Sequence, residues 1–404
     1  MGKASKPATI RPMNSTATVS WKQRAAIWLG IGINPASITL GGGLAAVFPM
    51  QILLPIMFIG ASLLSLICIA QGISARRFGH TVSKQALHIF GDSIGAKLLN
   101  LLMAIGMVGW GGFHIGVSGA SAADLFQLPG WIGTLIIATA VFTLSNFGVS
   151  RWNALLWLTT LSALALAISA LVITDARPVW ESNPDSVPFS QILWAVATVF
   201  TYAILFALRS ADFSWNVARD RDIHISGLLF FVSFIVGMLV GAILYQTTGD
   251  WNLADVLSNA QSASLGHIFL IVSVASPALS GLHSGSLALT SITKLKPRIT
   301  ILIICLITFT LGATRFDRQL IPFLDLVSTI LPPVLFIILV IIWWQPQTKP
   351  KTAVIAWLIG ATVALFLKLQ GQLIHMPIGA LVSLASLYLL NTFMPTRQPT
   401  QPQN

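Results

Sequence analysis

The chain has 404 residues, of which 55% are hydrophobic and only 9% are charged, and its mean hydropathy is +0.81. A soluble globular chain carries about 25% charged residues, so this composition excludes an ordinary soluble domain and indicates a membrane protein with many spans. The formal net charge of +11 would suit nucleic acid, but the positions of the cations along the chain do not indicate such a partner.

Apolar runs that cross a hydrocarbon core of about 30 Å need about 20 residues each. We predict twelve such runs, of which the ninth is short. In chain order they cover 25–46, 49–71, 97–124, 130–149, 153–174, 190–209, 226–247, 265–289, 299–313, 320–344, 352–368 and 377–394. Polar segments separate most of them, such as "TDARPVWESNPDSVP" at 174–188, and the pattern predicts an all-α polytopic fold.

Twelve spans put both termini on the same side of the membrane. If that side is cytoplasmic, 19 of the 23 Lys and Arg residues, Arg209 among them, fall in cytoplasmic segments, and Arg177, Arg315, Arg318 and Lys368 fall outside. The positive-inside rule predicts this asymmetry. We therefore expect a multi-pass protein of the plasma (inner) membrane with both termini cytoplasmic, and the lipid bilayer, not nucleic acid, as its surroundings.

Catalytic, metal and disulfide signals are missing from the sequence. The first 20 residues are polar and lack the apolar core of a cleavable signal peptide, so we expect a cytoplasmic tail. Cys68 and Cys305 both lie in apolar runs and give no disulfide framework or metal-ligand spacing. Without a phosphate loop, a metalloprotease motif or paired carboxylates, we predict no enzyme activity, no cofactor and no metal site.

The first run, "AAIWLGIGINPASITLGGGLAAVF", carries Asn34-Pro35 near its middle and five glycines around it. Proline removes an amide donor, and the residue before it is pushed away from helical geometry. Secondary transporters use such a break to expose backbone groups to ion and substrate. An ordinary proline kink in a membrane helix is the simpler alternative, and the Asn and Gly residues favour a functional break.

The third run contains "GWGGFHIG" at 109–116. Most of the 13 Trp residues fall near span ends, where indoles favour the interface, but Trp110 lies at the centre of its run. His114 follows four residues later and therefore shares its helical face. An indole wall beside an imidazole suits a planar heteroaromatic ring. The alternative is a core tryptophan beside a histidine that is hydrogen-bonded inside the bundle.

Two later runs hold further candidates. Tyr202 and Phe206 form an i, i+4 aromatic pair in the sixth run, although plain packing is the commoner role of such pairs. The eighth run carries Ser273, Ser276, Ser280 and Ser284 around Pro277. These hydroxyls suit an ion or a substrate, but they also suit close helix packing. No carboxylate lies near the centre of a run, which argues against a strongly cationic substrate.

Taken together, the "GGGLA" of the first run, the segment 72–110, and "SADFSWNVARDRD" at 210–222 resemble the nucleobase:cation symporter-1 family, most nearly its purine-cytosine permease-like branch. That family shows a Gly-Trp followed four residues later by a polar side chain in helix three. It also shows an Ala-Asp-Phe or Pro-Asp-Phe motif after helix six. The resemblance extends over roughly residues 24–300 in order and spacing.

The resemblance implies a LeuT-type fold with two five-helix repeats of inverted topology and discontinuous helices one and six. The implied boundaries are a tail at 1–23, repeats at 24–174 and 190–344, an extracellular loop at 175–189, two C-terminal helices in 345–394, and a tail at 395–404. Between Ser190 and Ser210, however, no Gly or Pro marks a break in helix six.

The resemblance also assigns roles to site residues. Trp110 would stack on the substrate, His114 would bond its edge, and Tyr202 or Phe206 would form the opposite wall. Ser280 would add a polar contact, and the opened backbone near Asn34 and Ser37 would complete the substrate site.

A coupling cation would lie near Ile33, Ala36, Ser273 and Ser276. However, helix eight reads Val274-Ala275-Ser276-Pro277 where sodium-coupled members carry adjacent hydroxyl residues. Either Na⁺ or H⁺ is therefore the expected coupling ion, and His114 is the candidate proton carrier because an imidazole titrates near neutrality.

The predicted function is cation-coupled import of a neutral planar nitrogen heterocycle, such as cytosine or a related pyrimidine base, by a symporter with alternating access. Alternatives are a transporter of another small solute on the same scaffold, for example a vitamin precursor such as hydroxymethylpyrimidine or an amino acid, or a transporter-like sensor that does not transport. A small-molecule substrate is the only partner expected, and no obligate protein partner is indicated.

Overall fold

The computed structural model describes residues 20–91, 94–146, 153–180, 186–259, 264–344 and 347–393. Within these ranges the chain is helical, with connecting turns and no strand. Most of the expected tail at 1–23, all of that at 395–404, and part of the expected loop at 175–189 lie outside the described residues.

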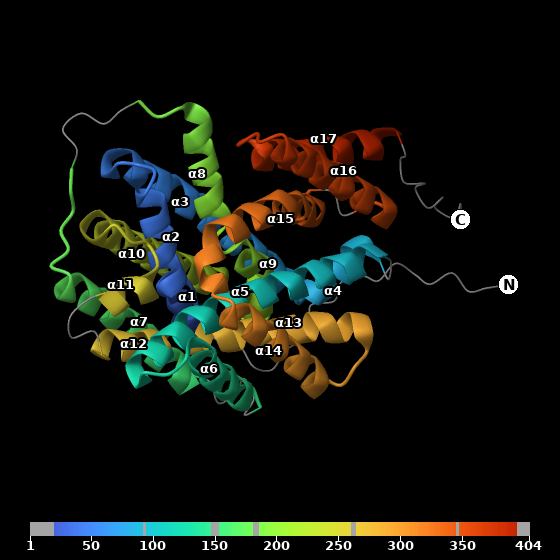
Figure 1. Ribbon diagram of the computed structural model, residues 1–404. Helices are drawn as coiled ribbons and strands as arrows, with labels where there is room; N and C mark the ends of the chain where they lie inside the picture. Colours follow the sequence, from blue (N-terminus) through green and yellow to red (C-terminus); the bar gives the residue numbers. More distant parts are fainter. Residues whose placement is uncertain are drawn as a thin grey trace, which may run out of the picture.

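The elements, in chain order, are α1 Trp21–Gly32, α2 Pro35–Ala45, α3 Met50–Phe78, α4 Val82–Phe90, α5 Ile94–Phe126, α6 Gly130–Ser145, α7 Asn153–Ile173, α8 Phe189–Thr201, α9 Ile204–Ser214, α10 Asp220–Thr248, α11 Leu253–Asn259, α12 Ser264–Ser273, α13 Ala275–Thr293, α14 Pro297–Ala313, the 3₁₀ turn η2 Phe316–Gln319, α15 Leu320–Trp343, α16 Pro350–Leu369 and α17 His375–Phe393 (Figure 1).

All twelve predicted runs correspond to helical segments. In the described part of the chain, ten segments are long and apolar enough to cross a membrane, and α6 and α14 are shorter apolar helices. With 17 residues, α14 is about 25 Å long at 1.5 Å per residue, in keeping with the short ninth run. The all-α polytopic architecture expected from the sequence is confirmed.

The break in the first span falls between α1 and α2, at Ile33 and Asn34. Asn34 has extended backbone angles, and its Oδ1 accepts a hydrogen bond of 2.8 Å from the amide of Ala36. Pro35 then occupies the first helical position, where a missing N–H costs nothing. The Asn-Pro pair therefore ends one half-helix and caps the next, which confirms the predicted discontinuity.

The sixth span is also broken, between α8 and α9, although no glycine or proline marks the position. Ala203 departs from helical geometry with φ −115° and ψ 33°. The neighbouring Tyr202 is held by tertiary contacts, because its ring stacks on Phe234 of α10 at 4.5 Å and its hydroxyl lies 3.0 Å from the Asn34 amide nitrogen. The resemblance predicted this break, and the packing of Tyr202 accounts for its position.

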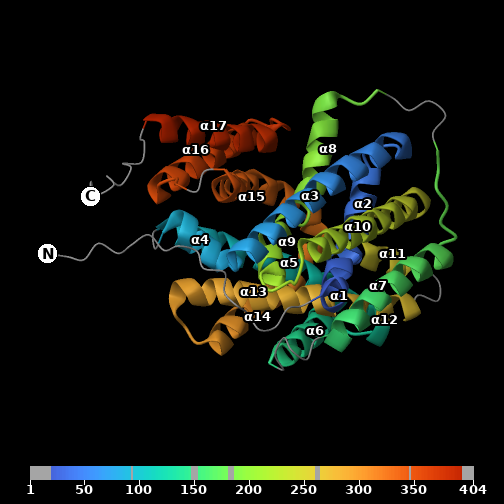
Figure 2. The same cartoon turned by 180° about the vertical axis from the view of Figure 1, so that it is seen from behind.

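Contacts between helices follow the symmetry of two repeats. The halves α1 and α2 pack on α10, and the halves α8 and α9 pack correspondingly on α3. Likewise α5 packs on α6 and α14, while α13 packs on α14 and α6. The pair α16 and α17 lies outside this pattern and packs on α15 (Figures 1 and 2). This is the five-plus-five arrangement with two additional C-terminal helices.

Glycines permit very close packing between α2 and α10. A Cβ added at Gly41 would lie 1.9 Å from the Met238 carbonyl oxygen, and one added at Gly241 would lie 1.7 Å from the Ile38 carbonyl oxygen. Real side chains do not tolerate such distances, so only glycine lets the two backbones approach this closely. The contact fixes the half-helix α2 immediately after the break.

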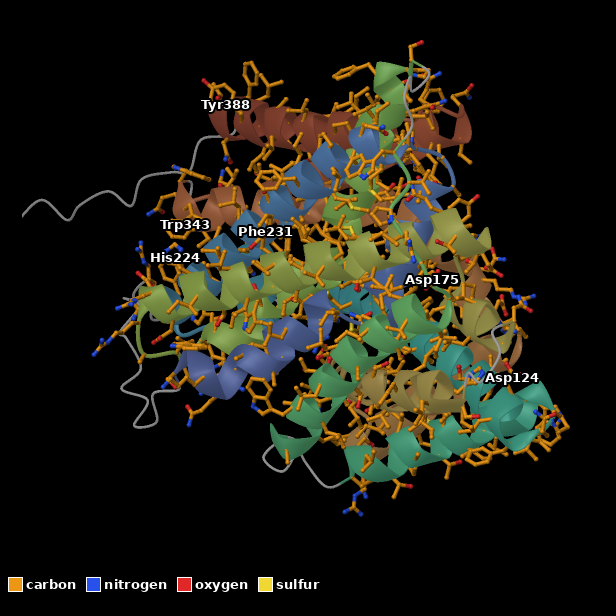
Figure 3. All side chains as sticks on the ribbon, turned by 90° about the vertical axis from the view of Figure 1, so that its left-hand side faces the viewer. Asp124, Asp175, His224, Phe231, Trp343 and Tyr388 are labelled. Carbon is orange, nitrogen blue, oxygen red and sulfur yellow. The ribbon has the colours of Figure 1, made fainter. Side chains whose placement is uncertain are left out.

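The bundle has two distinct ends, which we name after the short helices α4 and α11 that lie at opposite sides in Figures 1 and 2. Figure 3 places Asp124 and Asp175 on one side of the molecule and His224 and Trp343 on the other. At the α4 end, Arg76 and Arg77 of α3 form ion pairs with Asp220 of α10.

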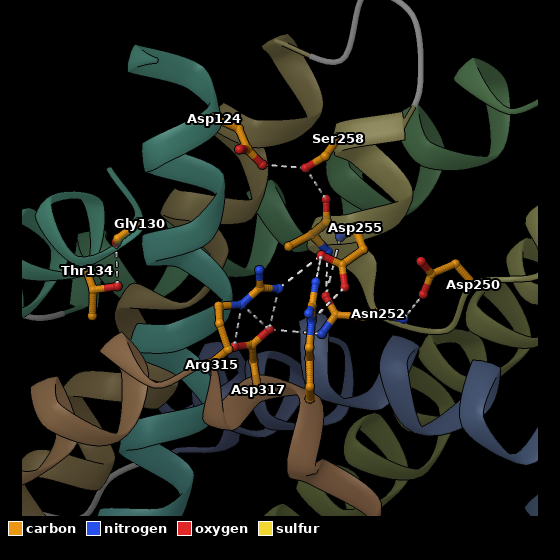
Figure 4. Close-up of polar contacts among 11 residues, drawn as sticks. Asp124, Gly130, Thr134, Asp250, Asn252, Asp255, Ser258, Arg315 and Asp317 are labelled. Atoms are coloured by element: carbon orange, nitrogen blue, oxygen red, sulfur yellow. Dashed lines mark hydrogen bonds and ion pairs between the residues drawn. The ribbon is translucent and has the colours of Figure 1, made fainter. Parts of the chain in front are cut away.

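At the α11 end, a polar network connects α5, α11 and η2 (Figure 4). Asp255 accepts hydrogen bonds of 3.0 Å from Arg315 and of 3.0 and 3.1 Å from Arg318. Arg315 also bonds the fully buried Asp317, which in turn accepts a bond of 2.9 Å from Asn252. The network holds η2, α11 and the end of α5 against one another.

Candidate functional site

A small cavity lies where the two helix breaks face α5 and α13. The space open to the centre of a water molecule is about 40 Å³. We call it the central cavity, and its lining residues are Ile31, Asn34, Met107, Trp110, His114, Tyr202, Ala203, Leu205, Phe206, Arg209, Pro277, Ser280 and Gly281. Six of the seven residues predicted for the substrate site are among them.

Asn34 and Tyr202 connect the two breaks directly. The Asn34 amide nitrogen donates to the carbonyl of Ile31 at 2.8 Å and to the Tyr202 hydroxyl at 3.0 Å. Tyr202 itself is 2% exposed and meets Trp110 edge-on at 5.3 Å. The side chains at the two breaks therefore brace each other and form one wall of the central cavity.

Trp110 and His114 lie on the cavity face of α5, as their spacing predicted. Their rings are stacked, with centroids 5.7 Å apart and planes inclined by 23°. The glycines around them admit neighbouring helices, since a Cβ at Gly109 would lie 2.3 Å from the Phe323 ring and one at Gly106 would lie 2.4 Å from Leu205. The motif thus combines two flat rings with closely packed neighbours.

His114 has hydrogen-bonding capacity that the protein leaves unused. The side chain is 3% exposed, and its Nδ1 has no hydrogen-bond partner. Within the described residues, no carboxylate lies at ion-pair distance from this imidazole. A buried polar atom without a partner is costly unless a ligand satisfies it, which is the position expected of a binding residue.

Phe206 and Ser280 also line the central cavity. Phe206 packs edge-on against Trp28 at 5.0 Å, and Trp28 is only 1% exposed. Trp28 thus packs inside the bundle as well, directly behind the cavity wall that Phe206 forms. Ser280 lies on α13, and its hydroxyl is 3.4 Å from the carbonyl of Pro277.

Ser37 does not reach the central cavity. Its hydroxyl donates to the backbone carbonyl of Asn34 at 2.9 Å and accepts from the backbone N–H of Asn34 at 3.1 Å, so it caps α2. The same oxygen would lie 2.2 Å from a Cβ at Gly237, which places the Ser37 side chain against α10. The local capping bonds, which sequence spacing does not reveal, direct the hydroxyl away from the cavity.

The four residues predicted for the cation site lie apart from the central cavity. Ile33 and Ala36 are buried at the first break, and Ser276 of α13 faces α1 with its oxygen 4.0 Å from a Cβ placed on Gly30. The Ser273 hydroxyl is hydrogen-bonded to the carbonyl of Leu270 within its own helix. No cluster of three His, Cys, Asp or Glu side chains that would suit a metal ion occurs in the described ranges.

Arg209 is the main residue that the sequence reasoning misplaced. It was counted among the cations of the cytoplasmic segments, but α9 continues to Ser214 and buries Arg209, which is 3% exposed. The predicted end of the sixth run was wrong, because it was placed at the arginine itself and α9 continues past it. A mid-helix Arg preceded by an apolar run is the signal that would have identified it, since intramembrane charges mark functional sites.

A second, larger cavity opens beside the first at the α4 end. It measures about 460 Å³ on the same scale, and we call it the inner cavity. Arg209 and Ser280 line both cavities, and the start of α4 and the end of α9 contribute Thr81 and Asp212. Asp212 accepts a hydrogen bond of 2.9 Å from the Val82 amide.

Comparison with solved structures shows the fold. The chain superposes on Mhp1, described as a nucleobase-cation-symport-1 family transporter in a closed conformation with bromovinylhydantoin bound, with a TM-score of 0.70, 15% identity, and 97% of each chain covered. The inward-facing conformation of Mhp1 gives a TM-score of 0.72 with 14% identity over 94% of each chain.

Two other transporters share the arrangement at lower similarity. A Na⁺-coupled sialic acid symporter in a substrate-bound outward-open state gives a TM-score of 0.64, 10% identity and coverage of 95% of this chain and 91% of that one. A manganese transporter of Eremococcus coleocola gives 0.57, 16% identity and coverage of 95% and 97%. No family model and no curated protein sequence matches the chain. The chain therefore has the LeuT-type fold that the resemblance implied.

Proposed function

We propose that this protein is a secondary transporter of the nucleobase:cation symporter-1 family, which imports a neutral planar nitrogen heterocycle such as cytosine or a related pyrimidine. The observation that carries the proposal is the central cavity, where the broken first and sixth spans meet Trp110 and His114 of α5. Broken helices beside a mid-bundle cavity are the binding architecture of secondary transporters.

The chemistry of the cavity wall favours a flat, neutral ring. Trp110 and Tyr202 present an indole and a phenol at right angles, so a ligand ring can stack on one and meet the edge of the other. His114 supplies its unpartnered Nδ1 for a hydrogen bond to a ring nitrogen or substituent, and Asn34 lines the cavity beside it. No Asp or Glu lines the central cavity, which disfavours a cationic substrate.

The comparisons support the same class of function without fixing the solute. The Mhp1 structure holds a substituted hydantoin, which is a nitrogen heterocycle, and the sialic acid symporter is Na⁺-coupled. We propose cation coupling here as well. The ion is Na⁺ if Ile33, Ala36, Ser273 and Ser276 hold it, and H⁺ if His114 carries it.

The proposed cycle is alternating access. The set α1, α2, α3, α8, α9 and α10 rocks against α5, α6, α12, α13 and α14, and the substrate stays at the central cavity between them. In this cycle the inner cavity is the route to the cytoplasm. The α4 end then faces the cytoplasm of a plasma (inner) membrane protein whose termini are both cytoplasmic, as the positive-inside rule predicts.

The test is uptake of labelled cytosine, uracil and hydantoin into proteoliposomes under an imposed Na⁺ or H⁺ gradient. We expect saturable uptake of at least one ring that depends on one of the two gradients. Competition with unlabelled hydroxymethylpyrimidine and amino acids identifies a different solute on the same scaffold. Binding of a ring without flux in any gradient would contradict transport and favour a sensor.

A further inference from the structure

Arg209 is a buried cation that the protein pairs incompletely. One terminal nitrogen donates to the Ser280 carbonyl at 3.0 Å, and the other lies 3.2 Å from the sulfur of Met107, which is a weak acceptor. The Nε–H is buried and has no hydrogen-bond partner. Of the five N–H donors that a guanidinium offers, only a minority have good acceptors.

Charge compensation around Arg209 is also incomplete. Asp212 lies one turn further along α9, but the described residues contain no ion pair between the two, and one Asp212 oxygen is occupied by the Val82 amide. The guanidinium carbon lies 5.3 Å above the Phe213 ring, a contact that adds modest stabilisation. Because an arginine keeps its charge when buried, a further acceptor at this point would be favourable.

Arg209 of α9 and His114 of α5 lie at the two ends of one row of α5 side chains. Met107, Trp110 and His114 follow one another at intervals of three and four residues, so they form one stripe on the cavity face of α5. Arg209 contacts Met107 at one end of this stripe, and His114 occupies the other end, with the Trp110 indole between them. A ring that binds beside Trp110 therefore has Arg209 toward the Met107 end of this stripe and His114 toward the other end.

We propose that Arg209 is a specificity-determining residue that binds a carbonyl oxygen on the inner edge of the substrate. This inference rests on the proposed function and assigns one residue of its substrate site. An oxygen acceptor completes the donor set of Arg209, as the Ser280 carbonyl already does in part. A neutral carbonyl suffices because Asp212 offsets part of the positive charge. An amino group at that edge would instead place its own N–H donors against the N–H donors of Arg209.

Arg209 also lies on the route between the two cavities, since it lines both. A substrate that leaves the central cavity toward the inner cavity must pass this side chain. The same arginine thus contacts the substrate edge before release. We expect loss of its charge to change which rings the site prefers and to leave the shape of the cavity largely as it is.

The experiment compares two planar six-membered rings in equilibrium binding to the purified full chain. Uracil carries ring carbonyls, and 2-aminopyrimidine carries none. We expect wild-type protein to prefer uracil by about 10- to 100-fold, the range of a hydrogen bond to a charged group. Arg209→Gln is expected to bring the preference close to one, and Arg209→Lys, which keeps the charge but not the fork of donors, to leave an intermediate preference.

Arg221→Gln is the matched control, because Arg221 is an exposed arginine at the start of α10. It should retain the wild-type preference. If wild type binds both rings and Arg209→Gln keeps the same preference, the inference about Arg209 is wrong while the proposed function stands. If wild type binds no nitrogen heterocycle at all, the proposed function fails and the inference fails with it. Arg209→Lys provides the same comparison if the Gln variant does not fold.

Discussion

Tyr202 joins the two broken spans through a single hydroxyl. That oxygen lies 3.0 Å from the Asn34 amide nitrogen and 3.2 Å from its amide oxygen, in a fully buried position. Removing it in Tyr202→Phe leaves the Asn34 side chain without its partner across the breaks. We expect a loss of about 1 kcal/mol in stability, seen as a lower melting temperature, and weaker substrate binding.

Tyr388→Phe is the control for that change, because Tyr388 is 65% exposed on α17 and should tolerate loss of its hydroxyl. Equal melting temperatures for the two variants would show that the Asn34–Tyr202 contact contributes nothing measurable to the folded state.

His114 distinguishes the two coupling ions. The structure shows an unpartnered Nδ1 and no neighbouring carboxylate in the described chain, so substrate contact is the role that its surroundings favour. In His114→Asn we expect weaker substrate binding with an unchanged pH optimum of uptake. A shift of that optimum in the variant, together with uptake that is independent of Na⁺, would instead identify His114 as the proton carrier.

At the scale of residues, the sequence identified the stacking pair and the first break but not the whole site. Trp110 and His114 were predicted to share one helical face because their spacing of four residues can be read from the sequence, as can the central position of Trp110 in its apolar run. Ser37 was misplaced because its hydroxyl caps its own helix, and Arg209 because the end of an apolar run was taken as the end of a helix. Local hydrogen bonds and helix continuation depend on tertiary packing, which no spacing rule contains.

The contact between α2 and α10 makes a prediction at the scale of elements. In Gly41→Val, the new Cβ alone would lie 1.9 Å from the Met238 carbonyl oxygen, and the two methyl groups add further atoms, so one of the two helices must move. We expect a stability loss of about 1–3 kcal/mol or more and impaired transport, measured by thermal unfolding and uptake. Gly130→Ala, where an added Cβ meets nothing within 4 Å, should behave as wild type. A fully stable Gly41→Val protein would contradict the close packing.

Several element boundaries were predicted closely, such as those of α7, α15 and α17, but α3 and α9 continue past the predicted ends of their runs at 71 and 209. The break in the sixth span is different, because its residues between Ser190 and Ser210 include no glycine or proline. Its position depends on Tyr202 stacking on α10 and contacting α2, both remote in sequence. Only the resemblance to a known family could indicate such a break in advance.

At the scale of the whole molecule, the polar network at the α11 end links α11 to η2 and to the end of α5. Burial opposes ionisation of Asp255, but hydrogen bonds from Arg318 and Arg315 outweigh it and hold the pKa of this carboxyl below its usual range. A lowered pKa in the folded state stabilises the protein above the ordinary value of about 4, and this stabilisation is lost as the pH falls through the folded value.

Asp255→Asn is therefore expected to be less stable than wild type at pH 7, by about 1 kcal/mol, and to approach wild type below about pH 4. Thermal unfolding over this pH range measures the difference. Asp175→Asn is the control, because Asp175 and Arg177 form an exposed pair of little energetic weight. A stability difference for Asp255→Asn that does not change with pH would contradict the ion-pair account.

The fold as a whole could be predicted because its spans, their number and their order are encoded in runs of composition. The arrangement of those spans as inverted repeats came from the resemblance, and the contacts between α1, α2 and α10 and between α8, α9 and α3 agree with it. The boundaries at 24–174 and 190–344 remain predictions.

The central claim is that Trp110 forms the stacking surface for a planar substrate at the centre of the bundle. Initial uptake of the labelled ring into proteoliposomes tests it most directly, with wild type, Trp110→Ala and Trp131→Ala at equal protein content. Stacking on an aromatic side chain contributes about 1–3 kcal/mol, so Trp110→Ala should lower apparent affinity by about 10- to 100-fold or abolish saturable uptake. Trp131, which is 56% exposed at the start of α6, should be dispensable. Normal saturable uptake by Trp110→Ala would contradict the account.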